Sequence, residues 1–250
     1  MKSHSKKRVY NSLFFSAVLF FVLFAAAFFI FTMLFYSVSP ALPDHDAYID
    51  QWPTVIIDAG HGGEDGGAIG INGALEKDIN LKIAKALNER LRESGIKCVM
   101  TREEDVLLYD KNSDYEGRKK ALDMQKRLQI ASEQENVIFI SIHQNSFPVE
   151  KYNGFQVYYS SNNPTSHSLA LTLENTVREE LQPYNDRASK DAGESIYLLK
   201  NLSCPAVLIE CGFLSNSEEC EALCGEEYQS RLSDILSDAV IKFISAQTGS

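Results

Sequence analysis

The sequence predicts a single α/β domain with a mainly parallel, twisted sheet covered by helices on both faces, preceded by an N-terminal transmembrane helix. Short runs rich in β-branched residues alternate with longer stretches whose apolar residues recur at helical spacing, as in βαβ units. Three of the short runs, at 54–58, 137–142 and 206–210, are almost continuously apolar. Such runs are typical of strands that are buried on both faces of a parallel sheet.

A long apolar segment near the N-terminus predicts the transmembrane helix. Residues 13–38 are interrupted only by Ser16, Thr32 and Ser37, and the basic residues come before them. A spanning helix needs roughly 20 such residues, whereas the apolar part of a cleaved signal peptide usually has about 7–15. We therefore expect an anchor that is not cleaved, with a signal peptide as the alternative.

This segment divides the chain into four parts. We expect a cytoplasmic basic tail (1–12), the anchor (13–38), a linker (39–53) and the folded domain (54–250). Basic residues before the apolar segment predict a cytoplasmic N-terminus. The protein is therefore expected to be a single-pass protein of the cell membrane with its domain on the extracytoplasmic side, or a secreted protein if the segment is cleaved.

The elements of the domain follow in order. The strand at 54–58 ends in a glycine-rich loop, and apolar residues at every fourth position predict a helix over 77–93, which Gly95 ends. Further along we expect a strand at 96–101, a helix within 115–135, strands at 137–142 and 154–159, a helix from 163 to 181, strands at 195–199 and 206–210, and helices from 217 and across 228–246.

Charge excludes one class of partner. The formal net charge is −10, and the first 43 residues contain basic residues but no acidic ones, so the rest of the chain is more acidic still. Nucleic-acid binding depends on clustered Lys and Arg. We therefore expect no nucleic-acid partner.

The cysteines do not settle the redox state of the protein. There are five, an odd number, and no CxxC pair occurs among them. Cys220 and Cys224 lie four apart in a predicted helix, which is poor geometry for a disulfide. Small buried side chains are the favoured interpretation, and a thiolate zinc site is the alternative.

Each of the three apolar strands leads into a residue that can bind a metal or move a proton. His61 follows the first strand, His143 follows the second, and Glu210 ends the third. Ligand sites in open α/β sheets lie beyond the carboxyl ends of the strands. Of the remaining histidines, His4, His45 and His167 are expected at the surface.

A catalytic zinc ion needs three protein ligands and one open position. Glu76, at the start of the first predicted helix, is the candidate third ligand beside His61 and His143. An acid favoured by the helix dipole is the alternative interpretation of Glu76, and polar side chains that are merely satisfied at strand ends remain the alternative for the whole set. The glycine-rich loop fits neither GxGxxG nor GxxxxGK[ST], so a nucleotide site is disfavoured.

Four motifs resemble the zinc-dependent N-acetylmuramoyl-L-alanine amidases (amidase type 3). In order they are DAGHGGEDGGA (58–68), LEKDINL (75–81), SIHQNS (141–146) and PAVLIECGFLSN (205–216). The resemblance extends over about residues 54–245. It implies that His61, Glu76 and His143 bind one Zn²⁺ per chain and that Glu210 is the catalytic carboxylate.

The plan of the chain narrows the resemblance. A single domain follows a short anchor, and the segments 101–105, 118–120 and 195–199 are similar to the germination-specific, spore-cortex amidases. The resemblance implies hydrolysis of the amide bond between the lactyl group of N-acetylmuramic acid and L-alanine of the stem peptide, in the formation of muramic-δ-lactam. Cys211 stands where the family often has Thr or Val, which puts a thiol near the metal.

Partners and alternatives follow from this resemblance. Peptidoglycan is the expected substrate, the membrane is contacted through the N-terminal helix, and an activating protein is a further candidate partner. Arg118, Arg187 and Lys190 are candidates for binding the anionic stem peptide, with a solvated surface as the alternative. The rival functions are a zinc peptidase that cuts within the stem and a catalytically silent wall-binding regulator.

Overall fold

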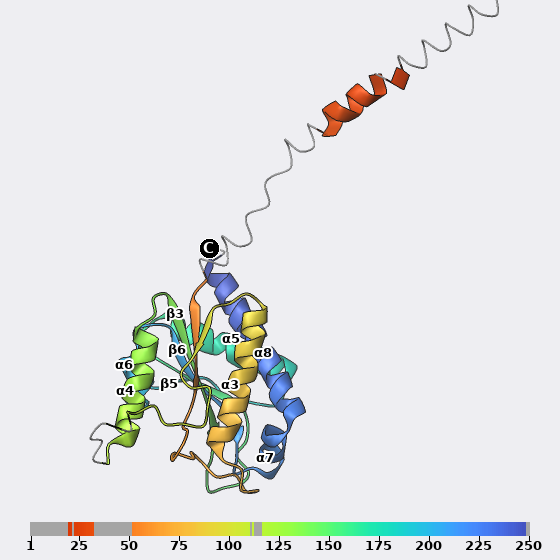
Figure 1. Ribbon diagram of the computed structural model, residues 1–250. Coiled ribbons are helices and arrows are strands. Elements are labelled where there is room, and N and C mark those ends of the chain that lie inside the picture. The colour runs from red at the N-terminus through yellow and green to blue at the C-terminus, as the bar shows by residue number, and fades with distance from the viewer. Residues whose placement is uncertain (1–19, 22, 33–51, 111, 113–116, 249–250) are drawn as a thin grey trace, which may run out of the picture. The chain divides into compact units, whose positions relative to one another are not determined.

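The computed structural model describes residues 20–21, 23–32, 52–110, 112 and 117–248 (Figure 1). The chain divides into two compact units, Met1–Tyr48 and Ile49–Ser250. In the first unit, residues 20–21 and 23–32 are helical. Over the residues that are described, no helix is both long and apolar enough to cross a membrane.

The predicted N-terminal organisation is therefore untested. The basic tail at 1–12 and nearly all of the linker at 39–53 lie outside the described residues, and so does much of the segment at 13–38. The anchor stays a prediction.

A mainly parallel sheet forms the centre of the second unit, as predicted. Its strands run in the order β2-β1-β3-β6-β4-β5. Their bounds are β1 (Thr54–Ala59), β2 (Cys98–Met100), β3 (Val137–Asn145), β4 (Gln156–Tyr159), β5 (Lys190–Asp191) and β6 (Ala206–Phe213). Only the pairing of β4 with β6 is antiparallel in this sheet.

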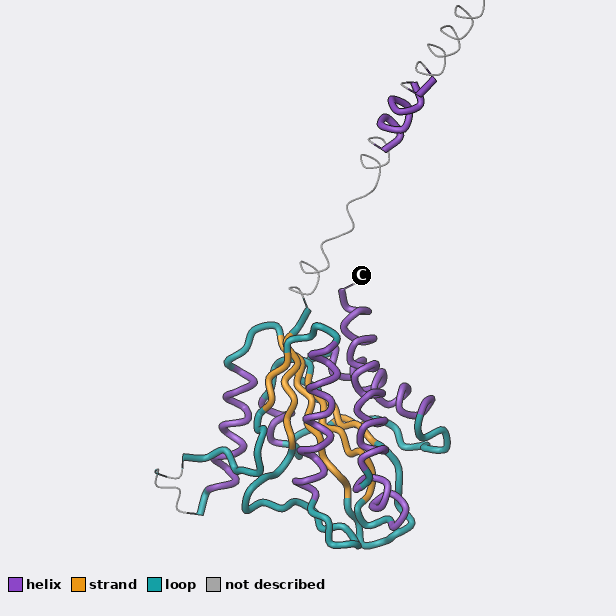
Figure 2. Tube along the Cα trace, turned by 45° about the vertical axis from the view of Figure 1, so that its right-hand side comes forward, coloured by secondary structure: helices purple, strands orange, loops and turns teal. Residues whose placement is uncertain are grey.

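Helices cover both faces of the sheet, which confirms the predicted layers (Figures 1 and 2). One face carries α3, α5 and α8, and the other carries α4 and α6. The helices are α3 (Glu76–Glu93), α4 (Lys119–Ser132), α5 (Thr165–Glu180), α6 (Tyr197–Asn201), α7 (Ser217–Cys224) and α8 (Glu226–Thr248).

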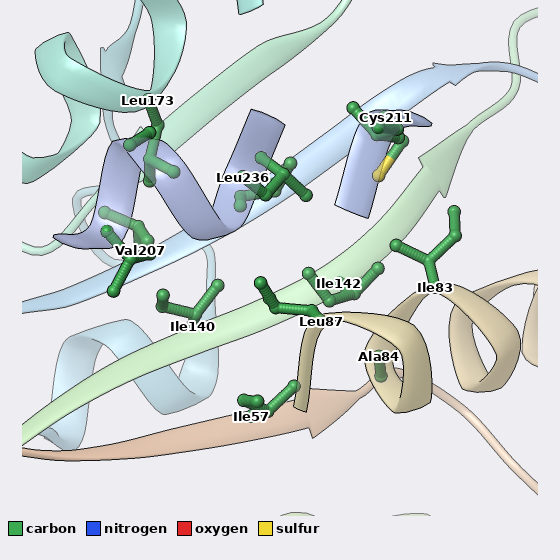
Figure 3. Close-up of a cluster of buried hydrophobic side chains, with 14 of the residues drawn as sticks. Ile57, Ile83, Ala84, Leu87, Ile140, Ile142, Leu173, Val207, Cys211 and Leu236 are labelled. Atoms are coloured by element: carbon green, nitrogen blue, oxygen red, sulfur yellow. The ribbon is translucent and has the colours of Figure 1, made fainter. Parts of the chain in front are cut away.

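The core lies in two layers because side chains alternate along each strand. Ile57, Ile140 and Val207 point to the face that α3 and α8 cover, where they meet Leu87 and Leu236 (Figure 3). Each such fully buried side chain stabilises the fold by roughly 1.5–3 kcal/mol.

The same alternation places the polar strand residues. Ile142 and Ile209 belong to the layer beneath α3 and α8. Their neighbours His143 and Glu210, one residue further along each strand, therefore belong to the opposite face, at the carboxyl ends of β3 and β6.

The prediction of a strand at 195–199 is wrong. Residues 197–201 form the short helix α6, in which the amide of Lys200 donates to the carbonyl of Ile196. The edge of β4 is already paired with β5, a two-residue strand that the sequence pattern did not predict. The apolar run therefore does not pair with β4, and its side chains Leu198 and Leu199 are instead buried against the sheet.

Candidate metal centre and catalytic carboxylate

Two histidines and a glutamate converge at the carboxyl end of the sheet. His61 lies in the loop after β1, Glu76 is the first residue of α3, and His143 lies near the end of β3. One ligand atom from each lies within 4.8 Å of the others. Oε1 of Glu76 is 3.2 Å from Nε2 of His61 and 3.0 Å from Nδ1 of His143. The structure thus brings together the three residues singled out from the sequence.

The His61 imidazole is oriented from behind. Its Nδ1 lies 3.1 Å from the Asp65 carboxylate, which leaves Nε2 facing Glu76. A carboxylate behind a metal-binding histidine fixes its tautomer and ring orientation. His61 itself has a left-handed backbone (φ 62°). This conformation is uncommon for a residue with a side chain and needs support from its surroundings.

Glu76 is held as a carboxylate. One oxygen accepts a hydrogen bond from the amide of Ala68 at 2.8 Å, and the other accepts one from the amide of Gln144 at 3.1 Å. Burial would raise the pKa of Glu76, but the hydrogen bonds with His143 and His61 outweigh it and hold this pKa well below its usual range. Glu76 is therefore in the form that binds a cation.

Two glycines leave the space that the three side chains occupy. A Cβ on Gly60 would lie 2.3 Å from the His143 ring, and a Cβ on Gly67 would lie 2.5 Å from the Glu76 carboxylate. The glycine-rich loop therefore makes room for these side chains.

The donor set fits a divalent metal ion. Two imidazole nitrogens and one carboxylate oxygen from three separate elements approach a common point, with ring centroids of His61 and His143 5.0 Å apart. Three protein ligands of this kind leave further coordination positions open, as in catalytic rather than structural zinc sites.

Glu210 lies beside this group and is unusual for a buried carboxyl. It pairs in register with His143 on β3 and with Gln156 on β4. Its Oε2 atom is buried and has no hydrogen-bond partner within the described part of the chain. Burial raises the pKa of Glu210 to about 7. A carboxyl that titrates near neutrality can both take up and release a proton during catalysis.

The candidate substrate-binding residues separate in the structure. Arg187 donates to the side-chain oxygen of Gln156, the register partner of Glu210, so this residue lies near the site. Arg118 is the exposed residue before α4, and Lys190 is exposed on the edge strand β5. His167 is exposed, as expected.

Sequence reasoning missed Arg127. This residue is fully buried on α4 and donates to the His61 carbonyl at 2.6 Å. A signal was available, because Arg127 lies between Met124 and Ala131 on the apolar side of the predicted helix. A charged residue in such a stripe indicates a buried ion pair.

All five cysteines are free thiols, and of these Cys211 and Cys220 are buried. Cys211 is fully buried in the layer beneath α3 and α8, on the opposite side of β6 from Glu210. Burial raises the pKa of the Cys211 thiol far above its usual value. Cys211 is therefore neither a ligand nor a reactive thiol in this fold.

Comparison with known proteins identifies the family. Residues 55–242 match the family model described as N-acetylmuramoyl-L-alanine amidase. The chain belongs to the N-acetylmuramoyl-L-alanine amidase family. It is therefore an amidase, a hydrolase of the cell wall, and the resemblance read from its motifs is confirmed.

Relatives of the amidase are similar over most of their length. The germination-specific N-acetylmuramoyl-L-alanine amidase of Bacillus subtilis (strain 168) is 33% identical over 189 residues, which cover 76% of this chain and 78% of that protein. The structure of the CwlD amidase from Clostridioides difficile in complex with the GerS lipoprotein is similar with a TM-score of 0.73 and 37% identity, covering 78% of this chain and 99% of that one. The amidase AmiC2 of Nostoc punctiforme is similar with a TM-score of 0.66 and 30% identity, covering 77% and 97% of the two chains.

Proposed function

We propose that this amidase uses one Zn²⁺, held by His61, Glu76 and His143, to hydrolyse the amide bond between the lactyl group of N-acetylmuramic acid and L-alanine of the stem peptide. One observation carries the proposal. The three ligand atoms lie within 4.8 Å of one another, and the register partner of His143 is Glu210, whose buried Oε2 has no hydrogen-bond partner in the described part of the chain. The donor set suits zinc, and Glu210 suits the proton transfers that amide hydrolysis requires.

The residues of the chain divide the work. A bound zinc ion supplies a Lewis acid that polarises the scissile carbonyl and activates water. Glu210 accepts the proton of the attacking water on its buried oxygen, holds it, and donates it to the departing alanine nitrogen. Asp65 keeps the His61 ring in place while this happens. Burial raises the pKa of Glu210 in the metal-free protein, which favours the protonated form that the second transfer needs.

A digest of isolated peptidoglycan tests the proposal. Residues 44–250 include the whole of the second unit, and would be incubated with peptidoglycan before and after zinc is added back to chelator-treated protein. Mass spectrometry should find free stem peptides that begin with L-alanine only when zinc is present. A cut elsewhere in the stem, with the muramoyl–alanine bond intact, would favour the rival zinc peptidase.

The second rival, a silent wall-binding regulator, predicts no product at all. Such proteins typically lack the catalytic carboxylate or one of the metal ligands. This rival is disfavoured because all four residues are present in this chain. Absence of cleavage on cortex and vegetative peptidoglycan alike, by protein shown to contain one zinc per chain, would support this rival.

We propose a role for the amidase in forming the spore cortex. Its support is the similarity to the germination-specific relative from Bacillus subtilis. A protein partner is proposed as well, since the similar amidase from Clostridioides difficile was solved in complex with a lipoprotein. Spores that lack this protein should contain little muramic-δ-lactam, and normal lactam content would rule the cortex role out.

We also propose that residues 13–38 anchor the protein in the cell membrane with the catalytic unit outside the cytoplasm. The support is the long apolar run behind a basic tail. Protease added to intact protoplasts should remove the catalytic unit and leave a short N-terminal fragment in the membrane fraction. Release of an intact, shortened protein into the medium would instead indicate a cleaved signal peptide.

A further inference from the structure

Arg187 is a half-buried cation that forms no ion pair among the described residues. Its guanidinium lies 4.8 Å above the Phe213 ring and donates to the side-chain oxygen of Gln156. Its Nε atom is buried and has no hydrogen-bond partner within the described ranges. Removing a charge from water without a counter-charge costs free energy. The partly buried guanidinium of Arg187 is therefore suited to bind an anion.

The surroundings keep Arg187 in this arrangement. The Gln156 amide nitrogen donates to the Ala188 carbonyl at 2.7 Å, which turns the Gln156 oxygen towards Arg187. The backbone amide of Arg187 donates to the Asn185 side chain at 3.1 Å, and its carbonyl accepts from Arg178 at 3.0 Å. The guanidinium is thus held by neutral partners and, among the residues that the structure describes, forms no ion pair with a carboxylate.

Arg187 also lies next to the proposed chemistry. Gln156, which it contacts, is the register partner of Glu210 across β4 and β6. The charge of Arg187 acts on Glu210, yet the two do not form an ion pair in the described structure, so the Glu210 carboxyl stays available for proton transfer.

We propose that Arg187 binds a free carboxylate on the stem peptide, close to the scissile amide, and thereby selects acidic over amidated stems. This inference rests on the proposed function. The amide link leaves no charge on the lactyl group, so an anion near the reacting bond can come only from the stem side. A planar guanidinium with free donors suits bidentate recognition of such a carboxylate.

Three aromatic side chains next to Arg187, Phe213, Tyr152 and Phe147, form an aromatic surface. Tyr152 stacks on Phe213 with ring centroids 6.4 Å apart, and Phe147 meets Tyr152 edge to face at 5.0 Å. Phe147 and Tyr152 remain 48% and 41% exposed. Aromatic side chains at a site offer apolar area with little loss of conformational freedom. This aromatic surface is placed to contact the aliphatic part of the stem peptide beyond the bound carboxylate.

The test compares two small substrates in which N-acetylmuramoyl-L-alanine is joined to a D-glutamate whose γ-carboxyl is blocked as a methylamide. The α-carboxyl of the glutamate is free in one substrate and converted to an amide in the other. The zinc-loaded wild-type amidase should cleave the acid with a kcat/KM about tenfold or more above that of the amide, as expected for one charge-assisted contact. Arg187→Gln should lose this preference by slowing only the acid. Arg231→Gln, which removes an exposed charge on α8, should keep it.

The outcomes separate this inference from the proposed function. Equal cleavage of acid and amide by the wild type, or equal slowing of both by Arg187→Gln, would overturn the role of Arg187 while the amidase activity stands. Failure of the wild type to cut the muramoyl–alanine bond in either substrate would overturn both. The preference of the wild type does not depend on how any variant folds, and zinc content with thermal unfolding would report whether Arg187→Gln is intact.

Discussion

Arg127 holds the backbone of His61 from inside the protein. Its Nη2 donates to the His61 carbonyl at 2.6 Å, and its Nη1 donates at 2.6 Å to Asp58. Arg127 and Asp58 are both buried, with 0% and 1% of their side chains exposed. The left-handed backbone of His61, in the loop after β1, is thus supported by a buried charge from helix α4. Fixing a ligand's backbone in this way limits how far its imidazole can drift from the metal position.

We expect Arg127→Met to weaken zinc binding about 10- to 100-fold, the usual effect of removing a group that orients a ligand. It should also destabilise the protein by about 3–5 kcal/mol, because Asp58 then remains buried without its partner. Zinc titration and urea unfolding measure the two effects. Lys126→Met, an exposed change on the same helix, is the control and should alter neither. Normal zinc affinity in Arg127→Met would show that His61 is positioned without this residue.

Gly60→Ala should abolish zinc binding although it adds only one methyl group. The added methyl would lie 2.3 Å from the His143 ring, which has to move away from the ligand position. Gly66→Ala is the matched control in the same loop, because its methyl would meet only the Leu75 side chain at 3.7 Å. Zinc content per chain measures the difference. Equal zinc content in the two variants would contradict the close approach of Gly60 and His143.

Substitutions at the proposed metal ligands and at the proposed catalytic carboxylate should have different effects on zinc content and on turnover. Glu210→Gln is expected to keep one zinc per chain and to lose about 10²–10⁴-fold in kcat, the usual contribution of general acid–base catalysis. His61→Ala and His143→Ala should lose the metal itself. Metal analysis and a peptidoglycan assay on the same preparations distinguish the roles. Wild-type turnover in Glu210→Gln, or stoichiometric zinc in both histidine variants, would refute these assignments.

Glu210 should make the metal-free protein less stable as the pH rises. Its pKa is about 7 in the folded protein against an ordinary value of 4.5, because burial disfavours the charged form. The folded state therefore has its full stability below pH 4.5 and loses up to about 3 kcal/mol as the pH rises through 7. Glu210→Gln removes this loss.

Unfolding of the metal-free protein at pH 5 and pH 8 measures this effect. The wild type should lose more stability than Glu210→Gln between these two values. Glu103→Gln, at an exposed position, should behave like the wild type. A pH dependence that is the same in the wild type and in Glu210→Gln would mean that Glu210 is hydrated.

The sheet and three of the four residues of the proposed site could be predicted from the sequence. Apolar strands that lead into His61, His143 and Glu210 place those residues at one edge of a parallel sheet, because parallel strands end together. The helices could be predicted as well, because apolar residues repeat along α3 and α8 at helical spacing. Periodicity is a property of a local segment, and it survives whatever the rest of the chain does.

The short elements could not be predicted. An apolar run such as 195–199 fits a strand and a helix equally well, and only the pairing of β5 with β4 decides between them. The local sequence around Glu76 likewise allows two interpretations. Local sequence makes it a helix-start acid, and the distances to two histidines make it a candidate ligand.

The sequence by itself determined the alternation of strands and helices and the family, because apolar spacing and motif order are written along the chain. Tertiary structure alone decided that His61, Glu76 and His143 meet, that Arg127 supports them, and that Arg187 lacks a counter-charge near Glu210. The physical reason is that charge, burial and ligand distance depend on which distant segments come together. Those contacts arise only when the sheet is assembled.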